Sequence, residues 1–199
     1  MNEIKIFNKW STDNITVTDP GLIDYINLRP IIIPRTGGRN VKTQFWKSKN
    51  HIVERLINKL MGPGHKGKKH KISSGNCGGK GITAYMIAEK TFMEIENQLK
   101  TNPIEVFVKA VENASPREEV TTIEYGGARY PKAVECAPQR RIDLALRLMV
   151  QGAYQASFGK RKTIEKALSE EIIKAYKIDP TSSSIAKKHE LERQADASR

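Results

Sequence analysis

The sequence contains little cysteine and no long apolar run. Its two cysteines among 199 residues, Cys77 and Cys136, form no CxxC pair and are too few for a disulfide framework. So few cysteines, without a disulfide framework, fit a protein of the reducing cytosol. The longest clear aliphatic run, Ile31-Ile32-Ile33, lies between two prolines and is far too short to span a bilayer. No basic region followed by an apolar one opens the sequence, so we expect no secretory signal.

The sequence also lacks a recognisable catalytic or metal-ligating set. His65, His70 and Cys77 match no familiar zinc spacing, and a closed site would need a fourth ligand. Adjacent carboxylates such as Glu118-Glu119 do not face each other on a strand or helix. The glycine-rich stretch has no Walker A pattern. We therefore expect no enzyme activity, no metal and no cofactor.

Positive charge is abundant. Lysine and arginine total 34 and acids total 22, which leaves a formal charge of +12 and a pI near 9.7. Such an excess favours a polyanionic partner. A soluble surface with extra lysine is the plain alternative. The basic residues are clustered rather than spread, however, and clustering favours nucleic acid.

Apolar periodicity predicts a single, mainly α-helical domain. The clearest amphipathic helix covers residues 82–100, where apolar side chains from Tyr85 to Leu99 are spaced three or four apart. Periodicity, caps and stop signals predict further helices over residues 22–28, 49–61, 103–114, 138–156, 164–177 and 184–197. Residues 1–20 read as an extended and weakly ordered segment. We expect a bundle of about six or seven helices.

Residues 117–136 predict a protruding β-hairpin arm inserted between two of these helices. A β-branched run ending at Tyr125 and the stretch from Ala128 flank Gly126-Gly127, which permits the positive φ angles of a tight turn. Pro131 makes the second strand interrupted or edge-like near the tip. A lone two-stranded ribbon is marginally stable, so it would gain order on RNA, on another protein or on its own domain.

The tip of the arm offers cations for phosphates and a flat ring for an unstacked base. The residues concerned are Arg129, Tyr130 and Lys132.

Further basic clusters suit RNA phosphates, although each is also compatible with an ordinary solvated surface. A glycine- and lysine-rich loop at 62–82 is notable because no acid occurs between Glu54 and Glu89. The candidate contacts are Arg35, Arg39 and Lys42 before it, Lys66, Lys68, Lys69, Lys71 and Lys80 within it, Arg140, Arg141 and Arg147 in the helix after the arm, and Lys160, Arg161 and Lys162.

The charged C-terminal stretch 183–199 contains the last predicted helix. Its only apolar anchors are Ile185, Leu191 and Ala195. A helix charged nearly all round more often lies on a partner than in a core, and the alternative is a frayed, exposed tail.

The stretch GGARYPKAVECAPQRRIDLALR, from Gly126 to Arg147, closely resembles the signature of the universal small-subunit ribosomal protein seven family in its archaeal and eukaryotic form. The likeness extends from FNKWS near Phe7 to ELERQADASR at the end of the sequence. This family has a helical fold with a hairpin arm, so the resemblance implies the same architecture as the apolar pattern.

The resemblance implies a structural constituent of the small ribosomal subunit, in the cytoplasm. Members of the family bind the 3′ major domain of small-subunit rRNA and help to organise the head, and their arm lies near the exit-site tRNA and the mRNA path. Neighbouring small-subunit proteins are further implied partners. By resemblance, the exit-site role falls to Gly126, Gly127, Arg129, Tyr130 and Lys132, and the rRNA role to Arg140, Arg141 and Arg147. The other clusters are assigned to rRNA by electrostatics alone.

Two other classes remain open. A winged-helix DNA-binding regulator also combines helices with a basic hairpin. An RNA-modifying enzyme would need a cofactor pocket or a catalytic set, and the sequence displays none. Gel-shift competition between duplex DNA and structured rRNA would test the first alternative, and cosedimentation with the small subunit would test the second.

Overall fold

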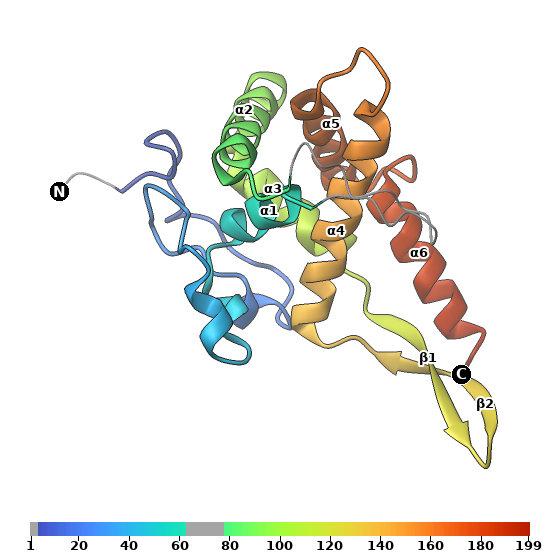
Figure 1. The fold of residues 1–199 in the computed structure, drawn as a ribbon. Coiled ribbons are helices and arrows are strands. Elements are labelled where there is room, and N and C mark those ends of the chain that lie inside the picture. Colours follow the sequence, from blue (N-terminus) through green and yellow to red (C-terminus); the bar gives the residue numbers. More distant parts are fainter. Residues whose placement is uncertain (1–3, 63–77) are drawn as a thin grey trace.

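Six α-helices and one β-hairpin dominate residues 4–62 and 78–199, the part of the chain that the computed structural model describes. The helices are α1 (Ile52–Leu60), α2 (Gly81–Leu99), α3 (Pro103–Ala114), α4 (Pro138–Ser157), α5 (Ile164–Tyr176) and α6 (Ser183–Asp196). Strands β1 (Glu118–Tyr125) and β2 (Ala128–Glu135) form an antiparallel hairpin between α3 and α4 (Figure 1). The predicted fold class, a helical bundle with an inserted hairpin arm, is confirmed.

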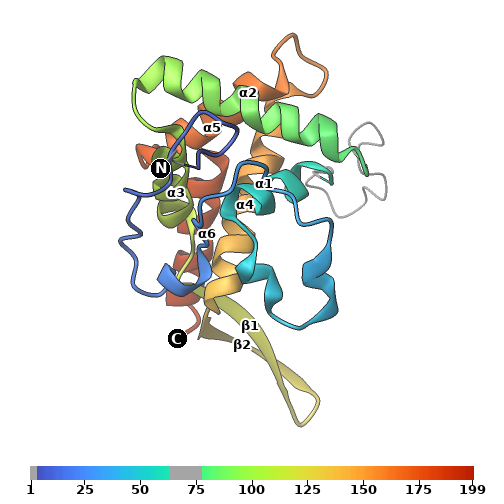
Figure 2. The ribbon, with the colours of Figure 1, turned by 90° about the vertical axis from the view of Figure 1, so that its left-hand side faces the viewer.

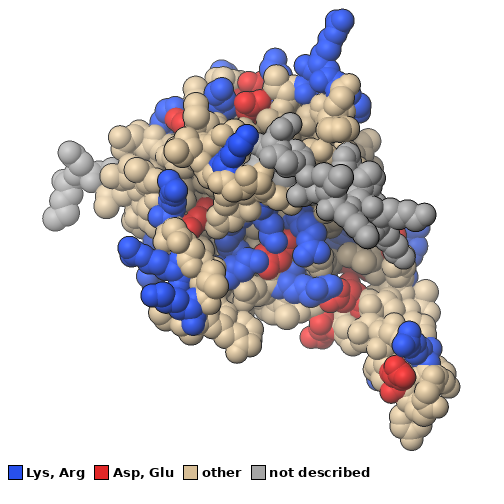
Figure 3. Space-filling model, viewed as in Figure 1, with Lys and Arg blue, Asp and Glu red and all other residues tan. Residues whose placement is uncertain are grey.

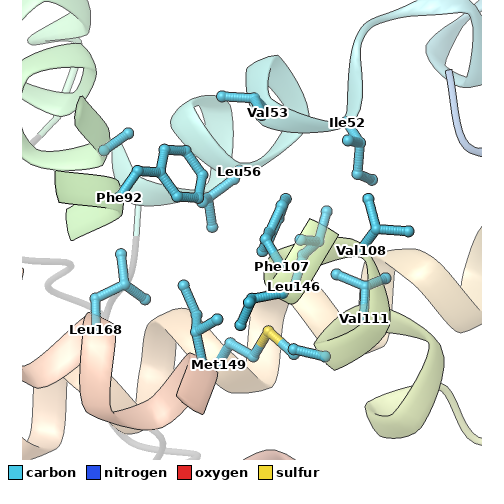
Figure 4. Close-up of a cluster of buried hydrophobic side chains, with 14 of the residues drawn as sticks. Ile52, Val53, Leu56, Phe92, Phe107, Val108, Val111, Leu146, Met149 and Leu168 are labelled. Carbon is cyan, nitrogen blue, oxygen red and sulfur yellow. The ribbon is translucent and has the colours of Figure 1, made fainter. Parts of the chain in front are cut away.

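The hydrophobic core lies where α5 packs against α2, α3 and α4. Phe92 of α2 and Phe107 of α3 are fully buried and meet edge-on, with ring centroids 5.6 Å apart. Leu146 and Met149 of α4 belong to the same cluster (Figure 4). Burial of such side chains is the main favourable contribution to folding. Because α3 and α4 are both part of this core, the hairpin begins and ends on a rigid base.

Local hydrogen bonds fix two helix starts. Asn102 caps α3 as the sequence predicts, because its Oδ1 accepts a bond from the Ile104 amide at 3.0 Å. At α6, the buried carboxylate of Glu171 accepts bonds from Ser182 Oγ at 2.8 Å and from the Ser184 amide at 3.0 Å. A negative group is favourable at a helix N-terminus, so Glu171 of α5 determines where α6 begins.

Residues 4–20 pack on the helical body, a contact that the sequence does not predict. Their backbone is irregular, yet Phe7 and Trp10 are buried in the core. The ring centroids of Phe7 and Tyr85 lie 4.7 Å apart, and Trp10 Nε1 donates to Glu96 Oε2 at 3.1 Å. The segment is held by contacts with α2, and contacts between distant parts of a chain leave no local periodicity to recognise.

The segment before α1 is also less helical than predicted. In place of a helix over residues 22–28 there is a single 3₁₀ turn, η1 (Ile23–Tyr25). Two further short 3₁₀ helices follow, η2 (Arg39–Lys42) and η3 (Trp46–Lys49).

Helix α6 packs one side against the body of its own chain, and its predicted contact with a partner stays a prediction. Ile185 is buried, Lys188 Nζ donates to Asn113 O at 2.8 Å, and Glu192 Oε1 accepts from the Arg117 amide at 3.1 Å. The inner side of α6 thus covers α3 and the base of β1. Charged side chains add to the contacts made by the buried apolar anchors Ile185 and Ala195, so a count of apolar anchors alone underestimates the packing of α6.

The arm extends beyond the helices in both ribbon views (Figure 1, Figure 2). Its register pairs Glu118 with Glu135 at the base and Tyr125 with Ala128 beside the turn. Both turn glycines have positive φ, 57° and 82°, as a two-residue hairpin turn requires. The second strand runs without interruption through Pro131, because alternation from the closing pair leaves the Pro131 nitrogen outside the ladder.

Candidate nucleic-acid interface

One face of the molecule is rich in positive charge. Figure 3 shows Lys and Arg side chains gathered over the segment before α1, over α1 and over α4, with few acidic atoms among them. Of the predicted contacts, Arg35, Arg39 and Lys42 are exposed on that segment, and Arg147 is exposed on α4. We refer to this surface as the cationic face.

A cluster of three cations around one carboxylate lies at the junction of the three elements, and a fourth cation, Arg147, lies near Lys59. Asp143 Oδ2 is 2.6 Å from Lys47 Nζ, and Asp143 Oδ1 is 3.3 Å from Arg55 Nη2 and 4.0 Å from Lys59 Nζ. Burial, followed by the charge of Lys47 and with a smaller contribution from Arg147, lowers the pKa of the Lys59 ammonium. The cations are therefore close enough to repel one another, and an approaching anion would relieve that repulsion.

Asp143 remains ionised within this cluster. Burial by itself would raise the pKa of its carboxyl, but the hydrogen bond from Lys47 and the charges of Arg55 and Lys59 together hold that pKa below its usual range. One negative charge thus orients the surrounding cations without neutralising them all.

Buried hydrogen bonds hold the segment before α1 in place. The carboxylate of Glu54, itself buried, accepts bonds from the Thr36 amide at 2.8 Å and from Thr36 Oγ1 at 2.6 Å. Arg55 Nη1 donates to Tyr25 O at 3.1 Å, and the Ile52 amide donates to Asn27 O at 3.1 Å. An irregular segment is thereby fixed on α1, which presents its exposed cations in one orientation.

A cavity of about 700 Å³ opens between residues 33–41, α1 and the start of α2. Val41 and Ile82 contribute apolar surface to its lining, and Arg35 and Lys59 contribute charge. Apolar walls beside cations suit an unstacked base and its phosphate.

Arg141 does not belong to the cationic face, and its predicted role changes accordingly. Its guanidinium is buried, where Nη2 donates to Asp19 Oδ2 at 2.6 Å and Nε donates to Pro116 O at 3.1 Å. Arg141 therefore joins the N-terminal segment to the start of the arm inside the protein. Arg140 is exposed, but its Nη2 donates to Glu119 Oε2 at 2.7 Å, so part of its charge is used at the base of the arm.

The predicted cluster Lys160, Arg161 and Lys162 is separate from the cationic face. It follows α4, whose 20 residues span about 30 Å, so it lies at the opposite end of that helix from the arm. Lys162 also forms an ion pair with Glu170.

The other predicted contacts divide between the arm, the start of α2 and the undescribed part of the chain. Gly126, Gly127, Arg129, Tyr130 and Lys132 are all exposed on the arm, and Arg129 Nε lies 3.5 Å from Glu124 Oε2. Lys80 is exposed immediately before α2. Lys66, Lys68, Lys69 and Lys71 lie outside the described residues.

Sequence reasoning missed Lys47 and Lys59 on the cationic face and Tyr125 on the arm. Arg55 and Lys59 are four residues apart on α1, and Asp143 and Arg147 are four apart on α4, so each pair shares a helix side. This spacing can be read from the sequence. The packing of α1 against α4, which brings the two pairs together, cannot be read from the sequence.

Cys136 and His51, two described residues with large pKa shifts, are both buried. No group of three or more His, Cys, Asp and Glu side chains among them is placed to hold a metal ion. Burial, followed by the charge of Glu119, raises the pKa of the Cys136 thiol to about 11, and burial lowers the pKa of His51 to about 4. Within the same residues, no helix combines the length and apolar character needed to cross a membrane.

Comparisons with known proteins agree with this architecture. A family model described as ribosomal protein S7p/S5e matches residues 28–199. A protein of Nanoarchaeum equitans is 55% identical over 197 residues, covering 99% of this chain and 100% of its own length. Proteins of Methanothrix thermoacetophila and Methanothermobacter thermautotrophicus are 46% and 48% identical, covering 98% and 94% of this chain and 100% and 95% of their own lengths. All three are named small ribosomal subunit protein uS7.

Proposed function

Because the chain belongs to the ribosomal protein S7p/S5e family, we propose that it binds the 3′ major domain of small-subunit rRNA and helps to organise the head of the subunit. Membership confirms the resemblance seen in the sequence and makes the chain a protein of the cytoplasmic small ribosomal subunit. The winged-helix regulator loses its support, because the helices and hairpin that suggested it are those of a ribosomal protein.

The cationic face is the observation that carries this proposal. Three cations surround one carboxylate where α1 meets α4, Arg147 lies near one of them, and exposed arginines and a lysine extend the surface along the segment before α1. These cations replace counterions around folded RNA, so affinity depends on salt. Recognition then comes from RNA shape, sugar hydroxyls and a few splayed bases. This role is structural binding without turnover.

The arm has a separate role in the proposal, because it projects from the body that carries the cationic face. It lies near the exit-site tRNA and the mRNA path. Neighbouring small-subunit proteins are further partners, and the outer side of α6, whose inner side is already packed, suits such contacts.

Salt-dependent binding of the full chain to a transcript of the 3′ major domain tests the role of the cationic face. Arg147→Gln should weaken binding and reduce the slope of log affinity against log salt by about 0.7–0.9, the value for one lost phosphate contact. Lys177→Gln, which removes the same charge from an exposed position at the end of α5, is the matched control. Arg141→Met should lower thermal stability and leave the salt slope unchanged.

Equal slopes for Arg147→Gln, Lys177→Gln and the unaltered chain would contradict the assignment of the cationic face. A reduced slope in Arg141→Met would instead return that residue to the RNA-binding set.

A shortened arm tests the second role. Replacing residues 122–131 by Asn-Gly joins Thr121 to Lys132, a pair whose mutual hydrogen bonds suit a two-residue turn. This variant should still cosediment with the small subunit, because the body is intact, and should lose protection of bases along the mRNA path. If it no longer docks on the subunit, the arm is an assembly anchor instead.

A further inference from the structure

The register of the hairpin divides the arm into two faces of different chemistry. Cross-strand partners share a face, and successive residues alternate between faces. One face carries Thr121, Ile123, Tyr125, Ala128, Tyr130 and Lys132, and we refer to it as the tyrosine face. The opposite face carries Thr122, Glu124, Arg129 and Pro131.

The tyrosine face exposes flat apolar surface to solvent. Tyr125 is 82% exposed, Tyr130 is 59% exposed, and Ile123 opposite Tyr130 is 43% exposed. The two tyrosines are diagonal neighbours, a relation that places side chains about 7–8 Å apart. Two large exposed rings on one small ribbon are costly to leave in water, which indicates a contact surface.

On the opposite face, the two charged side chains near the tip pair with each other. Arg129 Nε lies 3.5 Å from Glu124 Oε2, and these residues are cross-strand partners. An anion approaching Arg129 would also approach the negative carboxylate of Glu124. On the tyrosine face, Lys132 lies opposite the uncharged Thr121. Of the two faces, the tyrosine face is therefore the better suited to a polyanion.

The base of the arm determines which face continues into the cationic face. On the tyrosine side, Glu119 receives hydrogen bonds from Arg140 at the start of α4. On the opposite side, Arg199 Nη2 donates to Glu118 at 2.6 Å, and at the outer edge of β2 Ser198 O accepts from the Ala133 amide at 3.4 Å. The residues after α6 thus cover the base of the opposite face, whereas the tyrosine face adjoins α4, the helix that carries Arg147.

We propose that the tyrosine face is a stacking platform for unpaired bases of a single RNA strand. This inference rests on the proposed function, which places the arm beside such a strand. Every base has a flat π-face, so exposed aromatic rings bind single strands without reading their sequence. Tyr125 and Tyr130 supply the rings, Ile123 extends the apolar surface, and Lys132 meets the backbone. Arg129 serves to hold Glu124 across the ribbon and does not contact a phosphate.

Stacking can be measured with a short single-stranded RNA that carries 2-aminopurine, whose fluorescence falls when the base stacks. The full chain should quench this probe. Tyr125→Leu and Tyr130→Leu should each weaken probe binding by about 10-fold and reduce the quenching, because each removes one stacking ring. Tyr125→Phe and Tyr130→Phe keep the ring and should quench as the unaltered chain does. Arg129→Gln, on the opposite face, should leave probe binding within about twofold of the unaltered chain.

The same variants separate this inference from the proposed function. Each should bind the 3′ major domain transcript as tightly as the unaltered chain, because the cationic face is untouched. If the unaltered chain failed to bind that transcript, the proposed function would be wrong. Normal transcript binding with undiminished quenching in both leucine variants would overturn the stacking platform alone.

Two further outcomes would also overturn the platform. A larger loss of probe binding in Arg129→Gln than in the leucine variants would place the contact on the opposite face. Loss of a neighbouring protein from reconstituted subunits, with unchanged quenching, would make the tyrosine face a protein interface.

Discussion

Asp143→Asn is expected to destabilise the fold without weakening RNA binding. The Asp143 carboxylate contacts Arg55 at 3.3 Å, Lys47 at 2.6 Å and Lys59 at 4.0 Å. Asparagine keeps the size of the side chain and removes its charge. The surrounding cations then lack their common counter-charge, while an RNA phosphate meets one repulsive carboxylate fewer.

The magnitude of the effect depends chiefly on Arg55. Its side chain is only 1% exposed, so its charge has little access to water once Asp143 is neutral. Removing one partner of a buried ion pair costs about 3–5 kcal/mol, and the bond from Arg55 Nη1 to Tyr25 O, which remains, reduces that figure. Lys47 and Lys59 are partly exposed and add under about 1 kcal/mol. We expect a total loss of about 2–4 kcal/mol and a fall in Tm of about 5–12 °C.

Urea unfolding at neutral pH measures this loss, and Asp24→Asn, at an exposed position, is the matched control. The double variant Arg55→Met with Asp143→Asn should recover much of the lost stability, because it removes the buried charge together with its partner. At a temperature where all variants are folded, Asp143→Asn should bind the rRNA transcript at least as tightly as the unaltered chain.

Equal unfolding free energies for Asp143→Asn and Asp24→Asn would refute the claim that Asp143 holds the cluster together. Weaker RNA binding by folded Asp143→Asn would refute the claim that the cations, rather than the carboxylate, face the RNA.

Three further buried or tightly packed residues, His51, Gly152 and Cys136, each give a testable prediction. His51 has a pKa of about 4 in the folded protein against 6.5 when unfolded, so stability present above pH 6.5 should fall by roughly 2–3 kcal/mol toward pH 4, and His51→Asn should flatten that part of the pH profile of urea unfolding. Gly152→Ala should lower Tm although alanine favours helices, because its Cβ would lie 2.8 Å from Ser183 Cβ and press on Glu171 where α6 begins. Cys136, in a chain with Cys77→Ser, should react slowly with iodoacetamide at pH 8 when folded and rapidly in urea, because burial and a raised pKa keep it a thiol.

The helical fold was predictable because its signals are local. The start of α3 at Asn102-Pro103 and the apolar stripe of α2 can both be seen within one or two turns of sequence. The hairpin was predictable for the same reason, since paired glycines directly after a β-branched run that ends in an aromatic residue indicate a turn.

The candidate site was only partly predictable, as two arginines of α4 illustrate. Arg141 and Arg147 are six residues apart, which places them about 120° apart around the helix. Arg141 lies four residues before Ala145 and eight before Met149, so it continues the buried stripe of α4. This spacing could have predicted from the sequence that Arg141 is buried. Its partner Asp19 is 122 residues away in sequence, and no local pattern reveals such a contact.

Because the arm is attached to the body at its base, a small rotation there produces a large displacement of its tip. Each of its eight-residue strands is about 26 Å long, so a rotation of 10° at the base moves the tip by roughly 4–5 Å. That displacement exceeds the separation of two stacked bases. The Arg140–Glu119 and Arg199–Glu118 pairs at the base are partly exposed, and pairs of this kind weaken as salt rises. Ionic strength would thus alter where the far end of the arm points as well as how tightly the body holds its RNA.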